Sequence, residues 1–143
     1  MKKQQSKLFK IAVAGLHLKG EPLNYQLTEL GAIFHSNEQT APNYKMFLIK
    51  GGKLDKPGLA RVSKEALGNS YHIELWEMPI TAVGDFINLI PHPLGIGNIE
   101  LKDKTWVKGF ICEPNVIFDD IDISNYSSWI NYIEERNTNL DHD

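Results

Sequence analysis

The sequence has 143 residues, 42% of them hydrophobic and 23% charged, which is the composition of an ordinary globular protein with room for one sizeable core. Its net charge of −3 gives no general attraction to nucleic acid or to an anionic membrane, and no apolar run is long enough to span a bilayer. Cys112 is the only cysteine, so no disulfide framework is possible and a cytoplasmic location is expected.

The first predicted strand is Phe9–Gly15, an apolar run rich in small and β-branched residues. A Gly-X-His-Leu turn follows at 15–18, and leucines at helical spacing predict a helix between Glu21 and Leu30 with Pro22 in its first turn. A strand that passes into a helix at a glycine leaves backbone N–H groups free, and these groups and the helix dipole both favour an anion. The sequence therefore predicts an anion site beside His17.

Further strands and helices follow along the chain without a linker. Patterns rich in β-formers predict strands at 32–35, 44–49, 59–62, 71–78, 99–101 and 105–112, with the last two paired as a hairpin. Helical spacing predicts one helix from Pro79 to Ile90 and another over 124–134, with Ser124 as its N-cap. The stretch Pro91–Asn98 is dense in proline and glycine yet apolar, so we expect a loop that packs over something or lines a pocket.

The number and order of these elements favour one fold class. Strands outnumber helices and do not alternate with them regularly, which favours α+β over a doubly wound fold. We expect one domain over residues 1–143, with a core from about residue 8 to residue 134 and loose termini. Its architecture would be a small mixed β-barrel or curled sheet flanked by helices.

No motif in the sequence predicts a metal or a cofactor. The five histidines are scattered, without the spacing of a metal site. There is no P-loop, no GxGxxG and no GxSxG. We therefore expect a metal-free protein without a bound cofactor.

Several blocks of the sequence resemble the C-terminal domain of allophanate hydrolases. They occur in the family's order, cover roughly residues 10 to 133, and lie at 14–24, 30–32, 40–44, 56–59, 73–79, 90–101 and 107–114. The resemblance implies a fold similar to γ-glutamylcyclotransferases. It also implies that His17 is a catalytic residue and that the backbone of Gly15, Leu16 and Leu18 holds a substrate carboxylate.

Other residues are candidates for the same site. Tyr44 is a second catalytic candidate through its hydroxyl, although a tyrosine on a strand usually packs in the core. The remaining candidates for substrate binding are Asn24, Glu74, Pro93, Leu94 and Gly95. Each candidate residue, His17 included, could instead have a purely structural role. A histidine can be hydrogen-bonded within a loop, and a glutamate can belong to a structural ion pair.

Three classes of function remain open from the sequence. The resemblance implies an enzyme that decarboxylates N-carboxycarbamate to carbamate in urea and allophanate breakdown, with a small carboxylated substrate and a separate amidase as an upstream partner. A lyase of the γ-glutamylcyclotransferase type would need a carboxylate in the pocket, for which only Glu74 or Asp85 could serve. The third class is a non-catalytic module that binds a ligand or a partner, and a homodimer is a further expectation.

Overall fold

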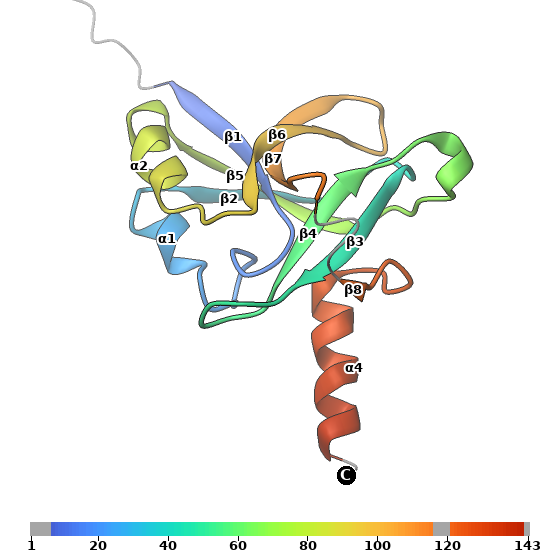
Figure 1. Ribbon diagram of the computed structural model, residues 1–143. Coiled ribbons are helices and arrows are strands. Elements are labelled where there is room, and N and C mark those ends of the chain that lie inside the picture. The colour runs from blue at the N-terminus through green and yellow to red at the C-terminus, as the bar shows by residue number, and fades with distance from the viewer. Residues whose placement is uncertain (1–6, 116–120, 142–143) are drawn as a thin grey trace, which may run out of the picture.

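The computed structural model describes residues 7–115 and 121–141, and for 140 and 141 only the backbone (Figure 1). The strands are β1 (Leu8–Val13), β2 (Ile33–Gln39), β3 (Tyr44–Ile49), β4 (Lys56–Arg61), β5 (His72–Pro79), β6 (Leu94–Glu100), β7 (Trp106–Cys112) and β8 (Ile121–Asp122). The α-helices are α1 (Tyr25–Thr28), α2 (Val83–Asn88) and α4 (Trp129–Asp141), and short 3-10 helices occur at Lys64–Ala66 and Ile80–Ala82.

The strands form two sheets. Five strands lie in the order β2-β5-β1-β7-β6, and three lie in the order β4-β3-β8. The larger sheet is mixed, because β1 pairs antiparallel with β5 and parallel with β7. The expected α+β class with a mixed sheet is therefore confirmed, but the described strands do not close into a barrel.

The first strand separates two hydrophobic clusters, because its side chains alternate between the faces of the sheet. Ala12 packs in a cluster with residues of β3, β4 and β5 and with Trp129 at the start of α4. Ile11 and Val13 pack in a second cluster, which includes Leu27 of α1 and Phe86 of α2. Figure 1 shows α4 extending away from the sheets beyond this anchored first turn. The turn after β1 thus lies where the two clusters meet.

The strand predicted at 44–49 matches β3, and the predicted hairpin is present as β6 and β7, which pair along their whole length. The prediction of a loop over Pro91–Asn98 is wrong for its second half, which belongs to β6. The segment is apolar because it lies in a sheet and pairs with β7. The strand β8 had no signal in the sequence.

The helix predictions were correct in type but wrong in extent. The region Glu21–Leu30 forms only the four-residue α1, and Pro22 lies in a turn before it, so no long helix points its dipole at the loop. Ser124 does not cap α4, which starts five residues later and continues through the tail expected to be loose. The Ser128 hydroxyl instead accepts a hydrogen bond from the N–H of Asn131 at 3.0 Å.

Candidate functional site

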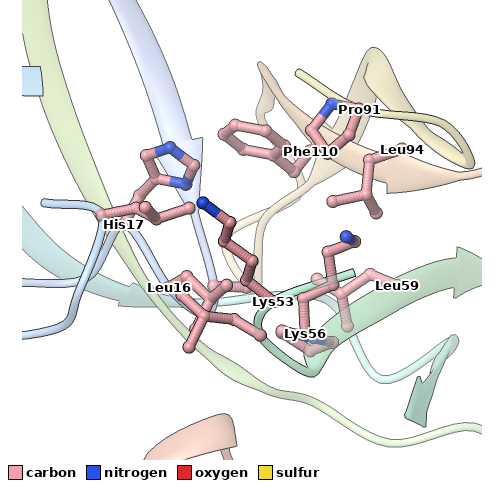
Figure 2. A pocket seen from close by; sticks show the side chains of 13 residues that line it. Leu16, His17, Lys53, Lys56, Leu59, Pro91, Leu94 and Phe110 are labelled. Carbon is pink, nitrogen blue, oxygen red and sulfur yellow. The ribbon is translucent and has the colours of Figure 1, made fainter. Parts of the chain in front are cut away.

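A pocket of about 240 Å3 lies between the turn after β1 and the loop that joins β3 to β4 (Figure 2). Its polar lining side chains are His17, Lys53 and Lys56. Its apolar walls are formed mainly by Leu16, Leu23, Leu54, Leu59, Leu94 and Phe110. A cavity of this size is at or below the lower limit for drug-sized ligands, so it suits a ligand of few atoms.

The imidazole of His17 is held on three sides. It stacks on Phe110 with ring centroids 4.9 Å apart, and its edge meets Phe86 at 5.4 Å. Its Nε2 lies 2.7 Å from Oε1 of Gln26, on α1. These contacts leave the side chain only 9% exposed and fix the plane of the ring beside the pocket.

Burial lowers the pKa of His17 below its ordinary value of 6.5, and the hydrogen bond to Gln26 opposes this effect only in part. The low-polarity surroundings disfavour the charged imidazolium. His17 is therefore neutral at pH 7, with one ring nitrogen protonated and the other able to accept a hydrogen bond.

The turn after β1 is held by hydrogen bonds that use some of its N–H groups. The Leu18 N–H donates to the carbonyl of Gly15 at 3.0 Å, and the Lys19 N–H donates to the Glu74 carboxylate at 2.9 Å. Within the described residues, no partner is found for the N–H groups of Leu16 and His17. These two groups, and not that of Leu18, are available to an anion at this turn.

Gly15 permits a close approach between the turn and β4. A Cβ atom at this position would collide with the ring of Pro57. Both residues line the pocket, so this contact sets the distance between two of its walls. The glycine of the Gly-X-His-Leu turn is therefore required by packing.

Two lysines of the site were not predicted from the sequence. Lys53 is exposed and Lys56 is half-buried, and neither has a carboxylate within 4.0 Å in the described part of the chain. Figure 2 shows the Lys53 side chain extending across the pocket toward His17. The only sequence signal was a basic, glycine-containing turn at 50–53, whose position beside the other walls depends on the tertiary structure.

Of the predicted site residues, the structure brings together Gly15, Leu16, His17 and Leu94, all of which line the pocket. Two other predicted residues form hydrogen bonds with the backbone of the turn. The Asn24 amide donates to the carbonyl of His17 at 2.8 Å, and the buried Glu74 accepts from the Lys19 N–H.

The remaining predicted residues lie elsewhere. Tyr44 is fully buried, and its hydroxyl accepts a hydrogen bond from the Glu100 N–H at 2.9 Å. Burial also raises the pKa of Tyr44, which keeps the phenol neutral. Leu18, Pro93 and Gly95 are not among the pocket-lining residues, and Leu18 belongs instead to the second hydrophobic cluster. The expected pairing of Tyr44 with His17 in one site is not what the structure shows.

The charge of the pocket indicates the kind of ligand that it can hold. In the described part of the chain, its lining includes two ammonium groups and a neutral histidine but no aspartate or glutamate. Glu74 and Asp85, the two acids considered for cyclotransferase chemistry, do not line it. The described residues also contain no cluster of side chains suited to a metal ion, and none of their helices is long and apolar enough to cross a membrane. The arrangement suits a small carboxylate ligand.

The fold and the pocket together define the class: a small α+β protein with two sheets and a pocket, lined by two lysines and a histidine, beside the turn after its first strand. The family model for the allophanate hydrolase C-terminal domain matches residues 9–134, so the chain belongs to this family.

Relatives and solved structures agree with this assignment. The chain is 41% identical over 128 residues to urea amidolyase of Lachancea kluyveri and 38% identical to that of Saccharomyces cerevisiae, and each match covers 87% of this chain. It spans only 7% of the length of these curated relatives. Allophanate hydrolase of Kluyveromyces lactis superposes with a TM-score of 0.85 at 40% identity, covering 94% of this chain and 22% of that one.

More distant structures show how far the fold extends. A protein specific to uropathogenic E. coli superposes with a TM-score of 0.81 at 26% identity, and the match covers 90% of this chain and 97% of that one. A γ-glutamyl cyclotransferase superposes with a TM-score of 0.55 at 10% identity, covering 75% and 68% of the two chains. The second likeness concerns the fold alone, and it confirms the expected relation to the cyclotransferase fold.

Proposed function

We propose that this protein decarboxylates N-carboxycarbamate, giving carbon dioxide and carbamate, in the breakdown of urea or allophanate. The observation that carries the proposal is the pocket of about 240 Å3 in which a neutral His17 faces two ammonium groups without an acidic partner. Membership of the allophanate hydrolase C-terminal domain family supports the choice of substrate.

The substrate and the pocket are complementary in charge. N-carboxycarbamate has two carboxylates flanking one N–H group, and it is small enough for this cavity. The ammonium groups of Lys53 and Lys56 can each bind a carboxylate, and the free N–H groups of Leu16 and His17 add two more donors. Apolar walls beside these groups lower the local polarity and strengthen the electrostatic attraction.

The reaction breaks one C–N bond. The departing carboxylate leaves as carbon dioxide, the bonding electron pair stays on nitrogen, and nitrogen takes up one proton to give carbamate. Because His17 is neutral, the proton comes from a pocket ammonium group, which water then reprotonates. His17 contacts the substrate nitrogen and holds it in place for this transfer.

A coupled assay tests the proposal. A separate amidase would hydrolyse the terminal amide of allophanate to N-carboxycarbamate, and carbon dioxide release would be followed with and without this chain. The wild-type chain should accelerate release, His17→Ala should not, and His72→Ala, which alters a histidine bonded to Asn37 outside the pocket, should behave as wild type. Malonate, a stable dicarboxylate, should raise the melting temperature of the wild-type chain.

Two results would overturn the proposal. If the wild-type chain binds malonate but does not accelerate release, the domain is a binding module and not a decarboxylase. If γ-glutamyl compounds stabilise it and dicarboxylates do not, its substrate belongs to the cyclotransferase class.

A further inference from the structure

Gln26 forms a hydrogen bond with the imidazole ring of His17. It lies on the short helix α1 and is half-buried, with Oε1 2.7 Å from Nε2 of His17. This contact is the shortest hydrogen bond that His17 makes in the described structure. Gln26 itself does not line the pocket.

The same segment of chain also holds the backbone of His17. The Asn24 amide donates to the His17 carbonyl at 2.8 Å, so residues two positions apart fix both the main chain and the ring. Phe110 and Phe86 prevent the ring from rotating out of this plane. The imidazole can therefore present only one of its nitrogens to the cavity.

In the structure the amide oxygen of Gln26, and not its NH2 group, faces Nε2 of His17. An amide oxygen only accepts hydrogen bonds, so Nε2 of the neutral ring must be protonated to donate to it. Nδ1 then has a lone pair, and within the described residues no hydrogen bond to it is found. Figure 2 shows a ring nitrogen of His17 directed toward the Lys53 side chain.

We propose that Gln26 is a positioning residue that fixes His17 as the Nε2–H tautomer, so that Nδ1 accepts a hydrogen bond from the N–H group of the substrate. The identity of the substrate rests on the proposed function, whereas the assignment of the tautomer does not. In the opposite tautomer, an Nδ1–H group would face the substrate N–H, and two donors would oppose each other.

The charged groups near His17 cannot accept the proton of its ring in a hydrogen bond. The titratable side chains that share the pocket with the ring are Lys53 and Lys56, which are cations and cannot accept a hydrogen bond. The contacts from α2 and β7 are the aromatic rings of Phe86 and Phe110. Gln26 is thus the acceptor that can hold the ring proton.

Nitrogen NMR of the His17 ring measures the tautomer directly and needs no substrate. In the wild-type chain at pH 7.5, Nε2 should show the shift of a protonated nitrogen and Nδ1 that of an unprotonated one. Gln26→Leu removes the acceptor at similar volume and should give a mixture of both tautomers. Gln39→Leu is the matched control, because Gln39 is exposed and its side chain hydrogen-bonds only to Lys102 among the described residues.

Kinetics then show whether the tautomer matters for the reaction. Gln26→Leu should lower kcat about tenfold or more while the Kd for malonate changes less than about twofold, because the loss concerns the orientation of the reacting nitrogen and not charge binding. Gln26→Glu keeps an acceptor but adds a negative charge, which raises the pKa of His17. It should therefore retain the Nε2–H tautomer and most of the activity only at alkaline pH, where the ring stays neutral.

The two proposals fail in different ways. An Nδ1–H tautomer in the wild-type chain, or an unchanged tautomer in Gln26→Leu, overturns the role of Gln26 whatever the activity. A wild-type chain with the expected tautomer that releases no carbon dioxide overturns the proposed decarboxylation and leaves the positioning of His17 intact. If Gln26→Leu does not fold, the wild-type NMR spectrum and the Gln26→Glu variant still test the role of Gln26.

Discussion

Two regions of this protein bury polar side chains, and they differ in how completely their hydrogen bonds are made. Beneath the three-stranded sheet, the Tyr71 hydroxyl donates to the Ser124 carbonyl at 2.7 Å, and the Ser124 hydroxyl accepts from the Met46 N–H at 3.0 Å. We call this group, together with Tyr44 and its contact to Glu100, the tyrosine cluster. Each of its three hydroxyl groups has a hydrogen-bond partner within the cluster.

The pocket differs from the tyrosine cluster in this respect. His17 uses one ring nitrogen, and Lys53 and Lys56 have no acidic partner in the described structure. Buried polar groups that are satisfied by the protein hold the fold together, whereas unpartnered groups beside a cavity are available to a ligand. The tyrosine cluster therefore stabilises the fold, whereas the pocket keeps polar groups that a ligand could bind.

The largest expected effect concerns the two lysines. Changing both Lys53 and Lys56 to Ala should weaken malonate binding about 100-fold, since a hydrogen bond to a charged group contributes about 1.5–3 kcal/mol. Calorimetric titration measures the Kd. The control is Lys64→Ala with Lys102→Ala, which removes the same charge outside the pocket. Equal weakening in both double variants would mean that net charge, and not the pocket, binds the anion.

The contact between Gly15 and Pro57 should give the next largest effect. Gly15→Ala should lower the free energy of unfolding by about 2 kcal/mol, because the added methyl collides with the Pro57 ring. Pro57→Ala removes most of that ring, so the double variant should lose less than the sum of the two single changes in a denaturant series. Gly95→Ala, which has open space around it, serves as the control. Additive losses would contradict the contact.

A smaller effect is expected from the tyrosine cluster. Tyr44→Phe removes the acceptor of the Glu100 N–H and should cost about 1 kcal/mol of unfolding free energy. Malonate binding should stay as in the wild type, because Tyr44 does not line the pocket. Loss of malonate binding at unchanged stability would instead mean that Tyr44 belongs to the binding site.

The smallest expected effect is the pH dependence of stability due to His17. Its pKa is lowered in the folded state by burial, so the unfolded chain binds the proton more tightly. The His17 contribution should be complete above about pH 6.5 and should decrease as the pH falls from there toward the lower folded-state pKa. Chemical unfolding at pH 7.5 and pH 5.5 measures it as the difference between wild type and His17→Asn. A larger His17 contribution at pH 5.5 would mean that the folded state prefers the charged ring.

Local sequence patterns were sufficient to predict those features that depend on neighbouring residues in the chain. The run Tyr44–Ile49 and the hairpin around 102–104 are strands in the structure because β-formers and turn residues act over a few positions. His17 could be predicted for the same reason, since the glycine turn to which it belongs is adjacent in the chain. The helix ends were wrong because tertiary contacts, and not propensity, end α1 and begin α4.

The sequence by itself determined the α+β class, the family resemblance and the turn that includes His17. Only the tertiary structure decided which residues share the pocket with it. Lys53 and Lys56 share the pocket with His17 because the loop after β3 folds beside the turn after β1, some 35 to 40 positions away in the chain. Tyr44 points into the core because its register on β3 places it there. Side-chain alternation is a local property, but the face of a sheet that meets a cavity depends on how the two sheets pack.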